Sequence, residues 1–337
     1  MAKIAFVEAS KLYKGASRPA VDAVTFDVPE GAICMLLGTS GSGKTTLLRM
    51  ANRLIEPTGG AILIDGKNIL EENPIQLRRR IGYVIQQVGL FPHMTIAENI
   101  RVTAEIAGGW ERNTLNQRVD ELLELVGLSP EEYRKRFPRQ LSGGQQQRVG
   151  LARALATDPT MLLMDEPFGA LDAITRARMQ DELLRIQRGV RKTVLFVSHD
   201  VDEAFKLGDQ IAVLSEGRLI QIGTPIELLT RPADDFVRKL VGADNILRQL
   251  QYLPVTVALD HDAALAQEQS EEMPVCDAQA TLLDAMLQLL QTRSPALTIV
   301  DGSTILGPIT LASINREITT ARTQGEQPAS TQEESRI

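Results

Sequence analysis

The stretch of sequence that decides the fold is Gly38-Thr39-Ser40-Gly41-Ser42-Gly43-Lys44-Thr45-Thr46. Its spacing fits the phosphate-loop pattern G-x-x-x-x-G-K-[ST]. Glycines let the backbone amides turn inward around phosphate oxygens, and the helix that follows adds its positive N-terminal end. In such a loop Lys44 reaches the β- and γ-phosphates, and the hydroxyl of Thr45 ligates Mg²⁺. We therefore predict that residues 38–46 bind ATP, with Mg²⁺ as the accompanying ion.

The segments around the loop indicate an α/β core. Residues 32–37 form a continuous apolar run, typical of a strand buried on both faces, and residues 45–54 have helical character. Two more apolar runs, 161–164 and 193–197, are strand candidates. Helices that alternate with buried strands predict a mainly parallel sheet.

Other patterns add two smaller parts to this core. Residues 3–9 and 21–28 are predicted strands, and residues 61–66 read as a hairpin, so we expect an antiparallel β subdomain. Residues 210–222 read as another hairpin across Glu-Gly. The insertion at about 88–158 is helix-rich and predicts a helical subdomain.

Two acidic residues end the apolar run 161–164. Asp165 is positioned to bind Mg²⁺ through water, and Glu166 is the candidate general base that orients the attacking water. The alternative is a strand that ends in two solvated carboxylates. Because the pair lies downstream of a phosphate loop, the sequence favours the catalytic interpretation.

A second glycine pair supplies the family resemblance: the segment is Leu141-Ser142-Gly143-Gly144-Gln145. It resembles the signature of ATP-binding-cassette (ABC) proteins. Ser142 is a candidate N-cap, and the two glycines expose their amides as a further anion site. In this family the signature of one copy closes on the ATP held by the phosphate loop of the other. The resemblance therefore implies a P-loop NTPase fold of ABC type and a dimer that sandwiches two ATP molecules.

Further family positions match in chain order. Tyr13 stands where the adenine-stacking aromatic belongs, although it is also compatible with a packing tyrosine. Gln86 resembles the glutamine that senses Mg²⁺ and water and links to the membrane subunit. Asp172 ends a loop that crosses the dimer interface in the family, and His199 resembles the switch histidine that contacts the γ-phosphate. The resemblance thus implies catalytic roles for Glu166, His199, Gln86 and Lys44, and metal roles for Thr45, Asp165 and Gln86.

The partners follow from the same resemblance. The chain has no apolar run long enough to span a bilayer and no apolar signal core, so we expect it in the cytoplasm. A single cassette of this kind resembles the separate ATPase subunit of a prokaryotic importer, and residues 90–99 resemble the region that receives the membrane subunit. This implies permease subunits as partners, a solute-binding protein reached through the complex, and a peripheral place on the cytoplasmic side of the inner membrane.

Two segments indicate which branch of importers the chain resembles. Residues 137–150 and 165–172 resemble importers of osmoprotectants such as glycine betaine, choline and carnitine. Importers of taurine, methionine or phosphate are the alternative, because the contacts to the solute lie on other subunits. A non-transport ABC ATPase that acts on DNA or ribosomes is less favoured. The net charge is −7 and no basic stripe is visible, so we expect no nucleic-acid partner.

The sequence changes character after about residue 242, so we place the ATPase domain at 1–242 and a small α+β domain at 250–319. Residues 250–320 contain nine acidic residues against Arg293 and Arg316. Residues 273–318 resemble one repeat of the cystathionine-β-synthase (CBS) type, which implies regulation by nucleotide or ionic strength. Residues 250–272 are too short for a clear first repeat, and an acidic surface that aids only solubility or dimerisation is the alternative. Residues 320–337 are predicted to be a disordered tail.

Overall fold

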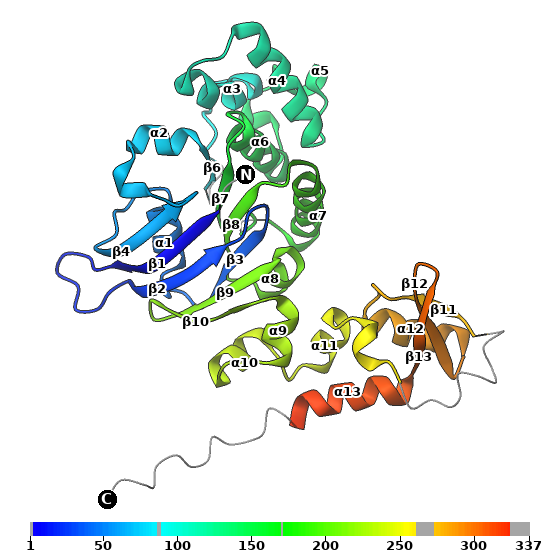
Figure 1. The fold of residues 1–337 in the computed structure, drawn as a ribbon. Helices are drawn as coiled ribbons and strands as arrows, with labels where there is room; N and C mark the ends of the chain where they lie inside the picture. The colour runs from blue at the N-terminus through cyan, green and yellow to red at the C-terminus, as the bar shows by residue number, and fades with distance from the viewer. Residues whose placement is uncertain (1–2, 86–88, 170, 261–272, 324–337) are drawn as a thin grey trace, which may run out of the picture. The chain divides into compact units, whose positions relative to one another are not determined.

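The computed structural model describes residues 3–85, 89–169, 171–260 and 273–323. The chain forms two compact units, Met1–Pro225 and Ile226–Ile337 (Figure 1). This division falls earlier in the chain than the boundary near residue 242 that the change in composition suggested.

A six-stranded sheet forms the centre of the first unit, and its fold is the predicted mainly parallel one. Five strands run parallel, and only the last strand along the chain is antiparallel to its neighbour. Three of the strands are buried at every position, which explains their continuous apolar sequences. In spatial order the strands are β10 (Arg218–Gly223), β9 (Gln210–Ser215), β3 (Ile33–Leu37), β8 (Thr193–Val197), β7 (Met161–Asp165) and β6 (Ile81–Val84).

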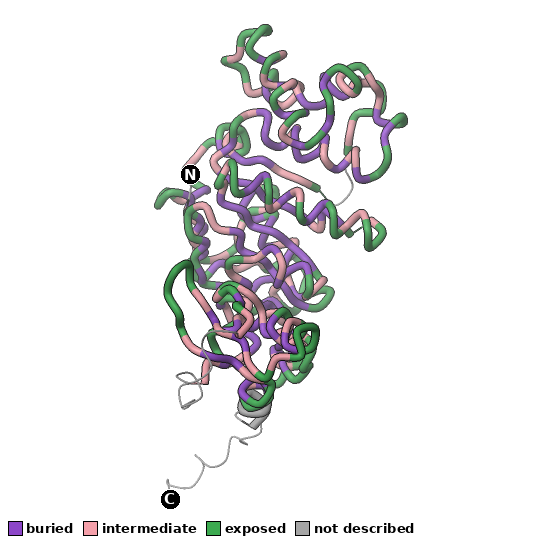
Figure 2. The backbone as a smooth tube through the Cα atoms, turned by 90° about the vertical axis from the view of Figure 1, so that its right-hand side faces the viewer, coloured by how far each residue is buried: buried purple, intermediate pink, exposed green. Residues whose placement is uncertain are grey.

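The predicted antiparallel subdomain is a four-stranded sheet in the same unit. Its strands in spatial order are β2 (Val21–Val28), β1 (Ile4–Lys11), β4 (Gly59–Ile64) and β5 (Lys67–Asn68). Helix α1 (Lys44–Ala51) shares one apolar core with this sheet and with one face of the central sheet. Figure 2 marks the buried residues along the backbone.

The predicted helical subdomain follows β6, a four-residue strand that the sequence patterns did not indicate. Its last helix, α6, packs against α3, α4 and β6. In Figure 1 helices α3, α4 and α5 gather beyond one end of the central sheet. The helices are α3 (Ile96–Ala107), α4 (Arg112–Leu125), α5 (Pro130–Tyr133) and α6 (Gly143–Leu155).

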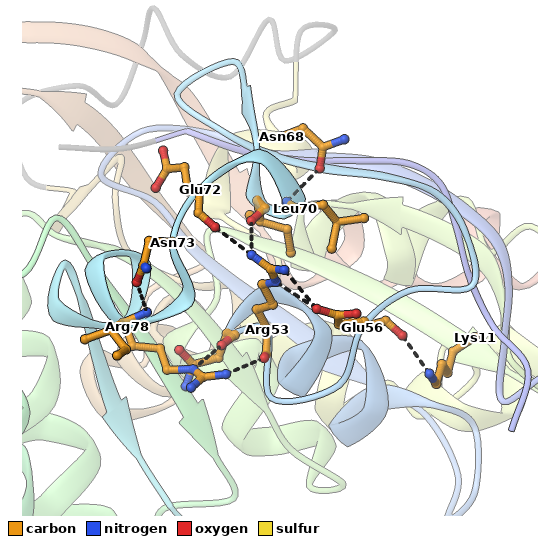
Figure 3. Close-up of polar contacts among 11 residues, drawn as sticks. Lys11, Arg53, Glu56, Asn68, Leu70, Glu72, Asn73 and Arg78 are labelled. Atoms are coloured by element: carbon orange, nitrogen blue, oxygen red, sulfur yellow. Dashed lines mark hydrogen bonds and ion pairs between the residues drawn. The ribbon is translucent and has the colours of Figure 1, made fainter.

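A polar cluster centred on Arg53 fixes the far end of α1 (Figure 3). The Arg53 guanidinium donates to the carbonyl oxygens of Ile69 and Glu72 at 3.3 and 2.6 Å, and it pairs with Glu56 at 2.9 Å. Arg78, from helix α2 (Pro74–Arg79), donates to the carbonyl oxygen of Arg53 at 2.6 Å. These bonds tie the helix that starts at the phosphate loop to the segment after β5, which includes the 3-10 turn η1 (Ile69–Glu71).

Two helices complete the first unit, and both help to place the site. Helix α7 (Ala173–Val190) follows β7, and helix α8 (Val201–Leu207) follows β8 and packs against β3.

The second unit contains the predicted order of strand, helix, strand, strand and helix. Strand β12 pairs in parallel with β11 and antiparallel with β13, and their inner face shares a core with α12 and α13. Among the described residues before β11, this unit has only helical elements. The tail predicted from residue 320 overlaps the end of α13. The elements are α9 (Pro225–Thr230), α10 (Asp235–Val241), α11 (Ile246–Tyr252), η3 (Val255–Ala258), β11 (Val275–Asp277), α12 (Leu282–Thr292), β12 (Ala296–Asp301), β13 (Thr304–Thr310) and α13 (Leu311–Thr323).

Two whole-chain features complete the description. In the described parts of the chain, no helix combines the length and apolar character that a membrane span requires. The two cysteines, Cys34 and Cys276, are free and buried in different units.

Candidate active site

The phosphate loop lies between β3 and α1, at the carboxyl end of a parallel strand. Gly43 has a φ of 98°, and a Cβ atom there would lie 2.4 Å from the carbonyl oxygen of Ala20, so only glycine fits. A cavity of about 340 Å³ opens at this loop. Its lining residues are Ala20, Ser40, Gly41, Ser42, Gly43, Lys44, Thr45, Thr46 and Glu166. The fold thus brings most of the predicted ATP-binding loop and the candidate base to one cavity.

Lys44 is held in the wall of this cavity, with 6% of its surface exposed. Its Nζ atom donates to the carbonyl oxygens of Gly38 and Thr39, both at 2.8 Å, and to Ser42 Oγ at 3.3 Å. Burial lowers the pKa of Lys44, and the charges of Glu166 and of the neighbouring Asp165 act in the opposite direction. Three acceptors of the phosphate loop therefore hold the Lys44 side chain in the wall of the cavity.

Thr45 and Asp165 form the candidate metal site. Thr45 Oγ1 donates to Asp165 Oδ1 at 3.1 Å, and Arg49 Nη2 lies 3.7 Å from Asp165 Oδ2. Burial raises the pKa of Asp165, and the hydrogen bond from Thr45 partly opposes this shift. In the described ranges no three His, Cys, Asp or Glu side chains cluster as a metal cage. A hydroxyl beside one carboxylate fits Mg²⁺, which commonly takes one or two protein carboxylates together with substrate phosphates.

The candidate base lies beside the predicted switch histidine. His199 Nδ1 is 3.1 Å from Glu166 Oε2, and the two side chains are 63% and 21% exposed. Glu166 has a φ of 45°, and its amide donates to the carbonyl oxygen of Val197 at 3.1 Å. This turn directs the carboxylate from the end of β7 toward the end of β8. Gln86, the third predicted catalytic side chain, lies outside the described residues.

The signature segment starts helix α6 and does not line the same cavity. Ser142 is its N-cap: Ser142 Oγ accepts from the amide of Gln145 at 3.4 Å, and Gln145 Oε1 accepts from the amide of Ser142 at 2.9 Å. Gly143 and Gly144 form the first turn, and Leu141 is buried just before it. The segment is therefore an ordered helix N-terminus, which favours anions.

Two other predicted residues lie near loop ends. Tyr13 is 42% exposed in the loop after β1, and Lys11 Nζ lies 5.5 Å from its ring centroid. Asp172 is the N-cap of α7: its Oδ1 accepts from the amide of Thr175 at 3.0 Å, and the contact with Thr175 lowers the pKa of Asp172. Ala170, in the same loop, lies outside the described residues.

The sequence patterns missed several residues that contact the site. Arg49 could have been found, because it follows Thr45 by four positions on one helix and so shares its face. Arg176 and Glu203 contact the segment around His199, and no spacing in the sequence distinguishes them from neighbouring charged residues.

Comparison with known proteins identifies the family. A model of ABC transporters matches residues 21–169. The glycine betaine/carnitine/choline transport ATP-binding protein OpuCA of Bacillus subtilis is 44% identical over 300 residues, which are 89% of this chain and 76% of that protein. The chain belongs to the ABC transporter family. The osmoprotectant import ATP-binding protein OsmV of Salmonella typhimurium is 47% identical over 289 residues, 86% of this ABC protein and 73% of that one.

Solved structures agree with this assignment. The dimeric post-hydrolysis form of the ATP-binding cassette MJ0796 with ADP and Pi is 33% identical, with a TM-score of 0.58 over 66% of this chain and 98% of that one. CbiO1 of Clostridium perfringens, part of an ABC transporter complex, is 27% identical, with a TM-score of 0.63 over 68% of this chain and 91% of that one. The predicted ABC fold is therefore confirmed, and this ABC protein binds nucleotide and is an ATP hydrolase coupled to transport. The predicted resemblance to the osmoprotectant branch is also confirmed, because both relatives named above are ATP-binding proteins of such systems.

Proposed function

We propose that this ABC ATPase powers the uptake of osmoprotectants of the glycine betaine, choline or carnitine type. The observation that carries the proposal is its identity of 42–47% to ATP-binding proteins of such systems, over 86–89% of the chain. Similarity of this extent includes both compact units and is not limited to the nucleotide site, which many importers share. Importers of taurine, methionine or phosphate remain the alternative.

The chain's own residues are suited to bind and orient ATP. The loop amides and Lys44 hold the phosphates, and the exposed ring of Tyr13 stacks on the adenine. Thr45 and Asp165 hold Mg²⁺, with Gln86 as a further predicted ligand. When bound, this ion neutralises charge that develops on the phosphate oxygens.

Glu166 is the proposed base for hydrolysis. Its carboxylate lines the same cavity as Lys44 and Thr45 and can orient a water molecule for in-line attack. His199, 3.1 Å from that carboxylate, is the proposed contact to the γ-phosphate. Its exposed ring leaves room for the phosphate to approach from the solvent side.

A second copy of the chain completes the site in this proposal. The N-terminus of α6 is exposed at Ser142 and Gly143, yet it lies outside the wall of the ATP cavity of its own chain. The cassette MJ0796 is dimeric with ADP and Pi bound, which supports a dimer here. The signature, Leu141 to Gln145, would then hold the partner's ATP, and the dimer loop, which we define as residues 169–172, would cross the interface through Asp172.

The membrane partners dock on the helical side of the first unit in this proposal. A mainly apolar cavity of about 330 Å³ lies between β6, α2, α3 and α6. Its lining residues include Ile75, Arg79, Tyr83, Ile106 and Arg153. A helix of a permease subunit fits a groove of this kind, next to residues 90–99. The chain would thus be peripheral, on the cytoplasmic side of the inner membrane, and would reach a solute-binding protein through the permease.

We also propose a regulatory role for the second unit. The order of β11, α12, β12, β13 and α13 supports a single CBS-like repeat within residues 250–319. Among the described residues before it, α11 and η3 are helical and do not match the element order of another repeat. A single repeat favours a response to ionic strength over a paired nucleotide cleft.

The test is solute uptake by proteoliposomes that contain the full chain and its permease subunits. With ATP inside, labelled glycine betaine, choline or carnitine should accumulate, and taurine, methionine and phosphate should not. Uptake of one of the latter three without the quaternary amines would replace the proposed substrate class. A chain that hydrolyses ATP but binds no permease would favour a non-transport role.

A further inference from the structure

Helix α7 presents two polar side chains to the segment that carries His199. Arg176 Nη1 lies 3.3 Å from Asp200 Oδ2, and Gln180 Nε2 donates to Glu203 Oε1 at 3.2 Å. The two residues are four positions apart, so they lie one turn apart on one face of the helix. Their partners lie at and after the switch segment, which we define as residues 198–200.

The same guanidinium reaches the dimer loop. Arg176 Nη2 donates to the carbonyl oxygen of Leu171 at 3.0 Å. Leu171 directly precedes Asp172, whose side chain caps α7. A guanidinium can hold two acceptors at once because its donors form a rigid planar fork. Arg176 therefore links the backbone of the dimer loop to a side chain of the switch segment.

The switch segment is anchored on both sides of His199. The amide of Asp200 donates to Ser198 Oγ at 3.0 Å, and Ser198 Oγ donates to Glu203 Oε2 at 2.5 Å. Ser198 and Glu203 are almost completely buried. The histidine ring itself is mostly exposed. The residues on both sides of the ring are thus held by buried neighbours.

These contacts surround a cavity of only about 20 Å³. That volume is close to what a single water molecule needs, so no nucleotide or solute can enter. Its lining residues are Glu166, Phe168, Gly169, Arg176, Ser198, His199, Asp200 and Glu203. The cluster therefore suits the positioning of neighbouring loops and not the binding of a ligand.

We propose that Arg176 is a positioning residue that ties the dimer loop to the switch segment. When a second copy binds the dimer loop, the guanidinium holds the switch segment in position, and His199 contacts the γ-phosphate. The inference rests on the role proposed above for His199. Dimer formation thereby affects hydrolysis through Arg176 and His199 and not through the phosphate loop.

The test is steady-state ATPase activity of the purified full chain. Arg176→Gln should lower kcat by about 10- to 100-fold, because small misplacement of a reacting group is costly. The KM for ATP should change by less than about threefold, since ATP-binding contacts remain. Arg178→Gln, an exposed arginine on the same helix, is the matched control and should keep the wild-type kcat.

A double-mutant cycle separates positioning from general damage. Because Arg176 acts through His199, Arg176→Gln should lower kcat by less than about twofold in a His199→Ala background. An equal loss in both backgrounds would overturn the inference. If the single variant Arg176→Gln turns over normally and the single variant His199→Ala is defective, the inference is overturned and the role of His199 stands. Normal turnover of His199→Ala would remove the role of His199 itself, and with it this inference.

A second variant covers the case in which Arg176→Gln fails to fold. Asp200→Asn removes the same ion pair from the other side and keeps an oxygen that can cap α8, where Asp200 Oδ1 accepts from the amides of Asp202 and Glu203. It should show the same loss of kcat and the same dependence on His199. Wild-type turnover of a folded Asp200→Asn, judged by its thermal midpoint, would overturn the inference.

Discussion

The Nδ1 atom of His199 lies 3.1 Å from the Oε2 atom of Glu166, across the ends of two adjacent parallel strands. The two residues are separated by an entire helix and strand in the sequence. Glu166, the candidate base, lines the cavity that also contains Lys44, and its contact with His199 places the candidate phosphate contact beside that base.

Replacing the candidate base should separate ATP binding from hydrolysis. Glu166→Gln keeps the size of the side chain but cannot accept a proton from water, so turnover should fall by about 10²- to 10⁴-fold. ATP binding should persist, and an ATP-bound dimer should appear in gel filtration. Lys44→Ala is the contrasting variant, and it should weaken ATP binding itself. Near-normal turnover of Glu166→Gln would assign the base role to another group.

Mixed dimers should reveal whether the signature serves the partner's ATP. A Lys44→Ala chain and a chain with a damaged signature should each be inactive alone, and their mixture should regain one intact site per heterodimer. Gly143→Asp is the better signature variant. A Cβ atom at Gly143 would meet nothing closer than Leu171 Cδ2 at 3.9 Å, whereas one at Gly144 would lie 2.9 Å from Thr175 Cγ2. Mixtures without recovered activity at any ratio would contradict a composite site, provided both variants are folded.

Glu203 predicts a pH-dependent stability effect. Burial raises the pKa of Glu203, and the hydrogen bond from Ser198 partly opposes the shift. A carboxyl whose folded pKa is raised stabilises the protein fully below its unfolded pKa, and this contribution is lost as pH rises through the folded pKa. Glu203→Gln should therefore raise the thermal midpoint relative to the wild type at pH 7.5.

The advantage of Glu203→Gln should shrink as pH falls toward the unfolded pKa, and scanning calorimetry at several pH values measures it. Glu124→Gln, which replaces an exposed carboxylate on α4, is the control and should show no such trend. The thermal midpoint of Glu203→Gln minus that of the wild type is the quantity compared. If this difference is lower at pH 7.5 than at acid pH, the ionised carboxylate stabilises its network and the prediction is wrong.

The acidic second unit predicts a salt effect on transport. Repulsion involving its carboxylates should weaken as the Debye length falls from about 10 Å at 0.1 M to about 3 Å at 1 M. Asp277→Asn with Asp301→Asn removes two exposed charges, and an asparagine at 277 keeps an oxygen for the amide of Gln279. This variant should be active at lower internal salt than the wild type in proteoliposomes. Glu111→Gln with Glu124→Gln in the first unit is the matched control. If the wild type and both double variants give identical salt curves, the second unit has a role other than sensing salt.

The sequence by itself was sufficient for the parts of the site that are local. A phosphate loop is defined by glycines and a lysine at fixed spacing, because neighbouring backbone amides must surround one phosphate group. Buried parallel strands appear as continuous apolar runs for a similarly local reason, since both of their faces need apolar side chains. The signature at residues 141–145 is also local, because an N-cap and two glycines make the helix terminus.

Only the tertiary structure decided which distant side chains meet. β6 has four residues and little periodicity, so its place beside β7 depends on pairing with a strand far along the chain. Arg178 is an exposed arginine on the same helix as Arg176, and no spacing in the sequence distinguishes the two. The guanidinium of Arg176 contacts Leu171 and Asp200 because α7 packs against α8, the helix that follows the switch segment. Such packing depends on the whole core and not on the neighbouring sequence.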